Sequence, residues 1–272
     1  MLAYDPLVSV HWLAQNLERV RVIDGTWSMP GDKTVQAGGF IPGASVFDID
    51  LIADPKSEMA HMLPTAETFA RAVSKMGISP SDTVVIYDRH GVFSAPRVWW
   101  TFRIFGHENV RVLDGGLPAW TQATHTTAPA PSVFPASRYT VQKPLARAAT
   151  LSEVLSALGA QTQIIDARPP GRFNGTTPEP RSGLASGHMP GAINIPFGSL
   201  RTPCMSFKPL DEIAQAFIGV DIDAPIITTC GSGITAAGLA FILARLGAAH
   251  VQVYDGSWTE YGAQPNVPID RH

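Results

Sequence analysis

Short runs of β-branched and other apolar residues alternate with longer amphipathic or wholly apolar segments along the chain. The short runs lead directly into Asp or Cys and predict buried strands over 20–23, 83–87, 110–113, 163–165, 226–229 and 251–254. The longer segments predict helices over 65–76, 95–105, 151–158, 210–218 and 234–246. Thr150 and Glu153 form a capping box at the start of the third of these helices, because each side chain can bind a free backbone amide. Strands that alternate with helices indicate an α/β fold, with a mostly parallel sheet flanked by helices.

The same order of segments occurs twice. Residues 21–25 (RVIDG) are matched by residues 163–168 (QIIDAR), about 142 positions later. Three further pairs follow in the same order at nearly the same spacing: 40–44 with 188–192, 84–88 with 226–230, and 112–116 with 253–257. Such self-similarity indicates a tandem duplication. It predicts an N-terminal domain over 1–120 and a C-terminal domain over 150–272, joined by a linker over 121–149 that is rich in Pro, Ala and Thr.

The composition narrows the class of protein. Of the 272 residues, 45% are hydrophobic, which is enough for a sizeable core and excludes a disordered chain. The formal charge of −3 argues against a nucleic-acid binder, because phosphate affinity depends on accumulated Lys and Arg. Charged residues make up only 16% of the chain, against about 25% in typical globular proteins, and two domains packed on each other would account for the deficit.

Membrane and export signals are weak in this sequence. The longest strongly apolar stretch, 234–244, is shorter than the roughly 20 residues that span a bilayer. The N-terminus lacks the charged, apolar and small-residue regions of a signal peptide. The two cysteines, Cys204 and Cys230, are too few for a disulfide framework. We therefore expect a cytoplasmic protein that binds neither membrane nor nucleic acid.

Cys230 lies between a predicted strand and a predicted helix, at the sheet edge where parallel α/β folds bind their ligands. The glycines after it allow a tight turn in which backbone N–H groups converge on one point, and the helix start adds positive potential. This loop comprises Gly231, Ser232, Gly233, Ile234 and Thr235. Such a setting stabilises a thiolate and suits a nucleophile. A buried structural cysteine and a phosphate-binding turn are the two other interpretations of the same pattern.

Three nucleophile chemistries fit the turn poorly. A cysteine phosphatase of the tyrosine-phosphatase type needs Arg six positions after the nucleophile, where this chain has Ala236. A thioredoxin-like site needs a second cysteine at the position of Gly233. A papain-like hydrolase needs a partner histidine, and no local signature supports one.

Several motifs together resemble the rhodanese family, in particular its two-domain sulfurtransferases. They are the duplicated halves, the segment Gly-His-Met-Pro-Gly-Ala at 187–192 and the segment Tyr-Asp-Gly-Ser-Trp at 254–258. The resemblance implies two tandem rhodanese-like domains, of which the C-terminal one is catalytic and forms a persulfide on Cys230. Asp88 occupies the corresponding position of the N-terminal, non-catalytic domain. The loop Cys-Gly-Ser-Gly-Ile-Thr-Ala at 230–236 is similar to the Cys-Gly-Ser-Gly-Val-Thr-Ala loop of 3-mercaptopyruvate sulfurtransferases, whereas thiosulfate-using rhodaneses carry basic residues there.

This resemblance implies a transferase that moves the sulfane sulfur of 3-mercaptopyruvate to cyanide or to a thiol such as thioredoxin, with release of pyruvate. Arg172 and Arg181 resemble the family's substrate arginines, and an arginine fork suits a carboxylate and the adjacent ketone. Ser232 would donate a hydrogen bond to the substrate or relay its proton. We expect no metal or other cofactor, because no cluster of ligand residues has metal-binding spacing. A thiosulfate sulfurtransferase and a non-catalytic rhodanese-like binding module are the alternatives.

The chain departs from the mercaptopyruvate-type pattern at Phe40. Relatives of this type have histidine in the matching N-terminal segment, and that histidine is given a proton-transfer role across the domain interface. A phenyl ring cannot carry a proton. Either the role is dispensable, or another group such as His61 takes it over, or the activity is altered.

Overall fold

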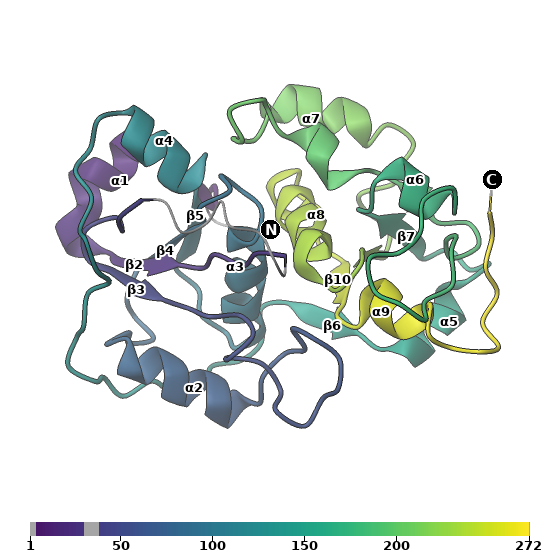
Figure 1. Ribbon diagram of the computed structural model, residues 1–272, viewed down its shortest axis with the longest axis horizontal. Helices are drawn as coiled ribbons and strands as arrows, with labels where there is room; N and C mark the ends of the chain where they lie inside the picture. The colour runs from purple at the N-terminus through teal and green to yellow at the C-terminus, as the bar shows by residue number, and fades with distance from the viewer. Residues whose placement is uncertain (1–3, 30–37, 272) are drawn as a thin grey trace.

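The protein forms two α/β halves that lie side by side (Figure 1). The computed structural model describes residues 4–29 and 38–271. The first half is built, in chain order, from β1 (Leu7–Val8), α1 (Val10–Asn16), the 3₁₀ helix η1 (Leu17–Arg19), β2 (Arg21–Asp24), β3 (Ala44–Val46), α2 (Ala66–Lys75), β4 (Val84–Tyr87), α3 (Ala95–Ile104), β5 (Val110–Leu113) and α4 (Gly116–Gln122).

The second half repeats this arrangement of strands and helices. Its elements are β6 (Arg147–Ala149), α5 (Leu151–Ala157), β7 (Gln163–Asp166), α6 (Pro170–Phe173), β8 (Ile193–Asn194), the 3₁₀ helix η3 (Phe197–Leu200), α7 (Leu210–Ala216), β9 (Ile226–Thr229), α8 (Ile234–Arg245), β10 (Val251–Tyr254) and α9 (Ser257–Tyr261).

Each half contains a five-stranded sheet, and the two sheets have the same topology. The strand orders are β1-β5-β4-β2-β3 and β6-β10-β9-β7-β8, and every pairing between these strands is parallel. The strands matched by the sequence repeat, β2 with β7, β4 with β9 and β5 with β10, take equivalent places in the two sheets. The predicted α/β fold and its tandem organisation are therefore confirmed.

The sequence prediction missed the four shortest strands and the helices α1, α4, α6 and α9. All predicted strands and helices are present to within about two residues, and Thr150 and Glu153 form the expected capping box. Strands β1, β3, β6 and β8 are only two or three residues long, too short for any periodicity to be detected. Strand β6 lies inside the segment 121–149 that was expected to be a linker, and it joins the second sheet by pairing with β10.

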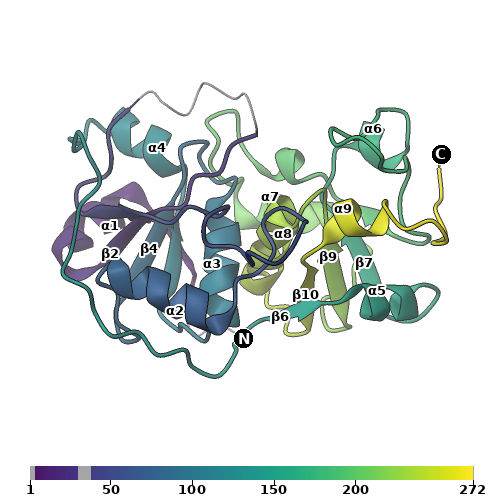
Figure 2. The same ribbon diagram turned by 60° about the horizontal axis from the view of Figure 1, so that its bottom comes forward.

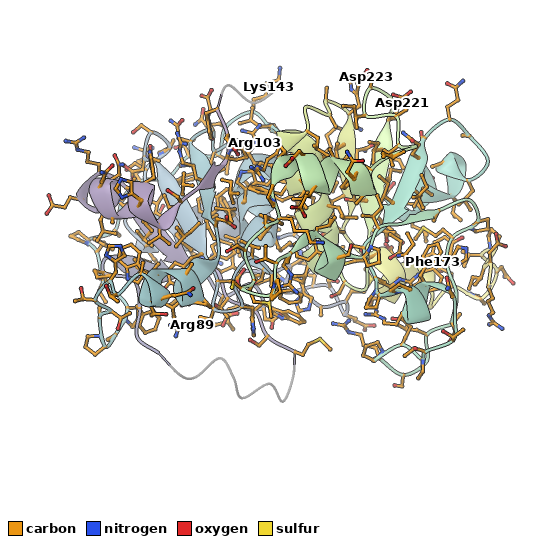
Figure 3. The ribbon with its side chains drawn as sticks, turned by 90° about the horizontal axis from the view of Figure 1, so that it is seen from above. Arg89, Arg103, Lys143, Phe173, Asp221 and Asp223 are labelled. Atoms are coloured by element: carbon orange, nitrogen blue, oxygen red, sulfur yellow. The ribbon has the colours of Figure 1, made fainter. Side chains whose placement is uncertain are left out.

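The segment between α4 and β6 runs along the first half before it enters the second. It contains no helix or strand, yet its backbone is bonded to the first half: Ser137 N–H donates to the Ser74 carbonyl at 2.9 Å, and Leu145 N–H donates to the Arg103 carbonyl at 2.9 Å. Arg103 and the linker residue Lys143 lie near each other at the boundary between the halves (Figure 3). The linker is therefore packed against the first domain rather than suspended between the two.

Helices α3 and α8 form the interface between the halves (Figure 2). Residues 95–102 of α3 are all buried, and nine residues of α8 are buried as well. The rings of Trp99 and Phe241 meet edge to face, with centroids 5.0 Å apart. Each helix covers its own sheet and the other helix, which explains why α8 is apolar on all sides. A buried interface of this kind needs few charged residues, in agreement with the low charge content of the chain.

His107 predicts a loss of stability at acidic pH. Its ring is fully buried; Nε2 donates to the Asp82 carbonyl at 2.9 Å, so Nδ1 accepts from the Tyr139 hydroxyl at 3.0 Å. Burial lowers the pKa of His107 below its usual value of 6.5, despite the opposing effect of the Asp82 carbonyl. The unfolded chain therefore takes up this proton more readily, and the free energy of unfolding should fall as the pH drops below about 6.5.

Urea unfolding at about pH 7.5 and about pH 5.5 measures this effect. The His107→Gln variant is the control, because its amide can donate to Asp82 and accept from Tyr139 but does not titrate. We expect a smaller decrease in stability for the variant than for the wild type. Equal decreases in both proteins would show that His107 does not contribute.

Candidate active site

A cavity of about 330 Å³ lies between the two halves, within the usual size range of small-molecule sites. It opens at the carboxyl edge of the sheets, the edge on which Arg89 and Phe173 lie in Figure 3, opposite Arg103, Asp221 and Asp223. Most of the predicted site residues line this cavity: Arg172, Arg181, Cys230, Gly231, Ser232, Ile234 and Thr235. Gly233 is not among the lining residues and instead occupies the N-cap position of α8.

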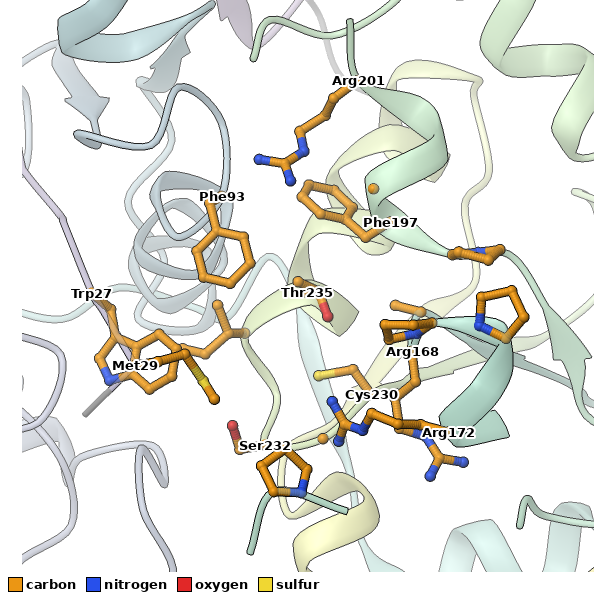
Figure 4. A pocket seen from close by; sticks show the side chains of 18 of the residues that line it. Trp27, Met29, Phe93, Arg168, Arg172, Phe197, Arg201, Cys230, Ser232 and Thr235 are labelled. Atoms are coloured by element: carbon orange, nitrogen blue, oxygen red, sulfur yellow. The ribbon is translucent and has the colours of Figure 1, made fainter. Parts of the chain in front are cut away.

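Cys230 follows β9 directly and is 2% exposed. The Gly233 N–H donates to its Sγ at 3.2 Å, and α8 begins at the next residue. Gly233 has a φ of +81°, and a Cβ at this position would lie 2.5 Å from Arg97 Nη1. Only glycine therefore permits this turn. Ser232, which is 8% exposed, lines the same cavity as Cys230 (Figure 4).

Residues at the start of α9 form hydrogen bonds to the backbone of Cys230 and of the loop after it, here called the cysteine loop. The N–H groups of Trp258 and Thr259 donate to the carbonyls of Cys230 and Gly231, both at 2.9 Å. The Thr259 hydroxyl also donates to the Gly231 carbonyl at 2.7 Å, while Ser257 Oγ accepts from the Cys230 N–H at 3.2 Å. The 254–258 motif of the sequence thus has a physical role, since it fixes the backbone that carries the thiol.

Arg172 is oriented by a buried carboxylate. Glu179 accepts a hydrogen bond from Arg172 Nε at 3.1 Å, and it also pairs with Arg168 Nη1 at 2.8 Å. The Arg172 guanidinium reaches the cysteine loop, because a Cβ at Gly231 would lie 2.8 Å from Nη2. No role was predicted for Glu179 from the sequence. Its position two residues before Arg181 was the only available signal, and that spacing does not show which arginines it binds.

The first half contributes His61, which lies against Arg181. His61 Nδ1 lies 2.5 Å from Asp50 Oδ1, and because a carboxylate only accepts, Nδ1 is the donor. Nε2 is then free to accept and lies 3.4 Å from Arg181 Nη2. Burial lowers the pKa of His61, with further lowering by Arg97 and Arg181 and opposition from Asp50. The ring is therefore neutral near pH 7.

Arg97 of α3 connects this histidine to the cysteine loop. Its guanidinium is 2% exposed and forms an ion pair with Asp255, with Nη1 2.6 Å from Oδ1. Nη1 also donates to the Gly233 carbonyl at 3.3 Å, and Nη2 donates to the His61 carbonyl. The second oxygen of Asp255 accepts from the Leu63 N–H at 2.8 Å. One buried ion pair therefore joins the loop after β9 to the segment 61–63 of the other half.

Asp88 fills the equivalent turn in the first half. It follows β4 as Cys230 follows β9, and it is fully buried. Its carboxylate accepts backbone N–H groups at distances between 2.7 and 2.9 Å, from His90, Phe93, Ser94 and Ala95. The Asp88 side chain thus binds the backbone amides of this turn, whereas in the second half the Gly233 N–H donates to the Cys230 sulfur. Asp88 has a structural role, and the first half lacks a nucleophile at this position.

Phe40 lies outside the cavity. Its backbone bridges to Ala128, and the Arg89 guanidinium sits 4.5 Å from its ring centroid. His188, at the matching position of the second half, bonds through Nδ1 to the Phe173 carbonyl at 2.9 Å within its own domain. Phe40 is therefore not among the residues that line the cavity, and His61 is the histidine that lies against Arg181.

Comparison with known proteins identifies relatives over nearly the whole chain. The model of the rhodanese-like domain matches residues 9–123 and again residues 150–264. The chain is 42% identical to thiosulfate/3-mercaptopyruvate sulfurtransferase 1 of Arabidopsis thaliana, covering 98% of this chain and 78% of that protein. It is 39% identical to the 3-mercaptopyruvate sulfurtransferase of Escherichia coli, covering 97% of each.

Solved structures agree with these sequence matches. The crystal structure of SseA, a 3-mercaptopyruvate sulfotransferase of Escherichia coli, aligns with a TM-score of 0.83 at 36% identity and covers 94% of this chain and 99% of that chain. The Tum1 protein of Saccharomyces cerevisiae aligns with a TM-score of 0.89 at 30% identity, covering 100% and 99% of the two chains. Within the described residues, no helix combines the length and apolar character needed to cross a membrane.

Proposed function

The chain belongs to the rhodanese family, and from this premise we propose that it is a 3-mercaptopyruvate sulfurtransferase. The observation that carries the proposal is the environment of Cys230: a loop without basic side chains whose Gly233 N–H donates to the sulfur, in a cavity whose lining also includes Arg172 and Arg181. Mercaptopyruvate carries its single carboxylate two carbons away from the sulfur. A neutral loop therefore suits the reacting sulfur, while cations farther out suit the carboxylate.

The reaction proceeds in two half-reactions. The Cys230 thiolate attacks the substrate sulfur, the carbon–sulfur bond breaks, and its electron pair leaves with pyruvate as the enolate, which then takes up a proton. The enzyme now holds a persulfide on Cys230. An acceptor thiolate attacks the outer sulfur of this persulfide, and the Sγ–S electron pair returns to Cys230. Covalent catalysis of this kind gives ping-pong kinetics.

The loop residues have distinct proposed roles. The N–H groups of residues 231–235 stabilise the thiolate and the persulfide anion, as backbone donors do wherever negative charge develops. Arg172 and Arg181 bind the carboxylate and the ketone. His61 is a positioning residue, since its neutral Nε2 accepts from Arg181 and holds that guanidinium toward the cavity. Ser232 donates a hydrogen bond to the substrate or relays its proton.

Incubating the protein with each sulfur donor tests the proposed function. The protein is mixed with 3-mercaptopyruvate or with thiosulfate, and cyanide is added as the acceptor. Pyruvate and thiocyanate are followed, and the intact mass is measured before the acceptor is added. We expect one added sulfur atom and rapid pyruvate release with mercaptopyruvate. A protein that gains no sulfur from either donor would be a binding module instead of an enzyme.

Thiosulfate is the second candidate donor, because the Arabidopsis relative is named for both donors. We further propose that a thiol such as thioredoxin accepts the sulfur and that the protein is cytoplasmic. Residues 1–120 form the non-catalytic domain in this proposal and residues 150–272 the catalytic one. The free thiols of Cys204 and Cys230 are consistent with a reducing compartment.

Replacing Arg181 with leucine should raise the KM for mercaptopyruvate. A charge-assisted hydrogen bond contributes about 1.5–3 kcal/mol, so the expected increase is roughly 10- to 100-fold. The rate with saturating donor should change much less. Steady-state kinetics with cyanide as the acceptor measure both quantities.

The matched control is Arg271→Leu, which removes an exposed arginine that donates to the Ser186 carbonyl. An unchanged KM in both Arg181→Leu and Arg172→Leu would remove the proposed carboxylate clamp.

A further inference from the structure

Arg201 is a cation of the active-site cavity that the proposed mechanism does not use. It follows η3 and lines the same cavity as Cys230. Arg172 lies beside Cys230, whereas Arg201 lies at the far end of the cavity (Figure 4). Donor binding by Arg172 and Arg181 therefore leaves Arg201 unoccupied.

Among the residues that the structure describes, the Arg201 guanidinium has aromatic neighbours but no hydrogen-bond or ion-pair partner. It lies 5.5 Å from the ring centroid of Phe197 and 5.8 Å from that of Phe93, both within cation–π range. Its Nε is buried without a hydrogen-bond partner, and over residues 4–29 and 38–271 the side chain forms no ion pair. Burial lowers the pKa of Arg201, and the charge of Asp88 only partly opposes this effect. A partly buried cation without a polar partner is stabilised when an anion binds beside it.

The position of Arg201 is fixed by contacts to both halves. Its backbone bridges to Phe207, whose N–H donates to Asp114 Oδ1 in the first half at 2.9 Å. These contacts hold the Arg201 backbone at the domain interface, from which its side chain lines the cavity.

A second cavity, of about 400 Å³, adjoins the first at Arg201. The two cavities share Met29, Phe93 and Arg201 as lining residues. The other cation of the second cavity, Arg89, already pairs with Asp24 at 2.9 Å and donates to the Gly38 carbonyl. An anion that enters from this side therefore meets Arg201 as the available cation.

We propose that Arg201 binds the carboxylate of a small thiol acceptor that reaches the Cys230 persulfide through the second cavity. The inference rests on the proposed function, because it concerns the second half-reaction. The acceptor thiolate RS⁻ attacks the outer sulfur of Cys230–S–SH, an S–S bond forms in the product RS–SH, and the Sγ–S bond breaks with its electron pair retained on Cys230. The outer proton moves with the transferred sulfur, so atoms and charge balance.

Two small thiols of similar size test this selectivity. Enzyme loaded with mercaptopyruvate, with the persulfide verified by intact mass, is discharged with 3-mercaptopropionate or with neutral 2-mercaptoethanol. For Arg201→Gln we expect kcat/KM for 3-mercaptopropionate to fall about 10- to 100-fold, with that for 2-mercaptoethanol changing less than about twofold. Taking the ratio of wild type to variant for each thiol cancels the intrinsic reactivity of the thiol.

Two control variants complete the experiment. Arg138→Gln removes the same charge from an exposed linker residue and should leave both rates unchanged. Arg201→Lys keeps a cation and should recover part of the preference for the carboxylate. Neither Arg201 variant should change kcat/KM for mercaptopyruvate. In ping-pong kinetics this quantity reports only the first half-reaction, in which Arg201 has no proposed role.

Each other outcome overturns the inference. An equal loss with both thiols would indicate a general disturbance of the site, and no loss with 3-mercaptopropionate would exclude carboxylate binding. A lower kcat/KM for mercaptopyruvate would assign Arg201 to the donor instead. If the wild type formed no persulfide at all, the proposed function itself would fail, and this inference with it.

Discussion

Replacing Cys230 with serine should abolish sulfur transfer, with pyruvate release lowered by at least about a thousand-fold. The serine hydroxyl is not ionised near pH 7 and cannot hold a persulfide. Pyruvate release from 3-mercaptopyruvate and the intact mass measure the two aspects of the loss. The variant should gain no sulfur atom. Its fold should remain intact, because the replacement is nearly isosteric and the loop is held by α9 and Arg97.

The chain offers a matched control in its second cysteine. Cys204 is exposed, whereas Cys230 is buried and lines the cavity. Cys204→Ser should therefore retain activity within about twofold and should still gain one sulfur atom. Persulfide formation in Cys230→Ser, or its loss in Cys204→Ser, would contradict the assignment of the nucleophile.

Replacing Arg97 with methionine should lower the free energy of unfolding by about 3–5 kcal/mol, because it leaves a buried carboxylate without its cation. The side chains of Arg97 and Asp255 are 2% and 6% exposed, so water cannot replace the lost partner. The carbonyls of Gly233 and His61 lose a donor in the same change. Sulfur transfer should fall as well, since the cysteine loop and His61 are held by this one guanidinium. Urea unfolding and mercaptopyruvate kinetics measure the two effects.

A double-mutant cycle separates the ion pair from the volume change. Arg97→Met combined with Asp255→Asn should cost less than the sum of the two single variants, because the double variant no longer buries an unpaired charge. Arg103→Met, on the same helix and with no ion pair among the described residues, should cost less than about 1 kcal/mol. Strict additivity in the cycle would show that the Arg97–Asp255 pair is not coupled.

Local sequence patterns were sufficient to predict most of the fold. The uninterrupted apolar run of α8 indicated a helix buried on all sides, and the structure places it between its own sheet and α3. The tandem repeat predicted one topology used twice, and both sheets have it. Strands β1 and β6 escaped detection because two or three residues at a sheet edge show no periodicity. Their place is set by the strands they pair with, β5 and β10.

The candidate site likewise has features that the sequence predicts and contacts that it does not. The turn at Cys230 is a local structure, since a strand, two glycines and a helix start suffice to build it, and its sequence was recognised on that basis. The contacts of Glu179 and Asp255 were not accessible to that reasoning. Asp255 follows a predicted strand, and no neighbour in the sequence indicates its partners: it binds Arg97 and the Leu63 N–H, which is 192 positions away in the chain.

The sequence by itself therefore determined the α/β class and the duplication and indicated Cys230 as the candidate nucleophile, because each depends on residues close together along the chain or on a repeat of them. Tertiary structure alone decided which groups of the first half reach the Cys230 loop and the cavity. Packing of α3 on α8 brings Arg97 to Gly233 across 136 positions and sets His61 against Arg181 across 120. The same packing places Phe40 outside the cavity and Arg201 at its far end. Such contacts depend on how two buried surfaces fit, and no local periodicity or motif encodes that fit.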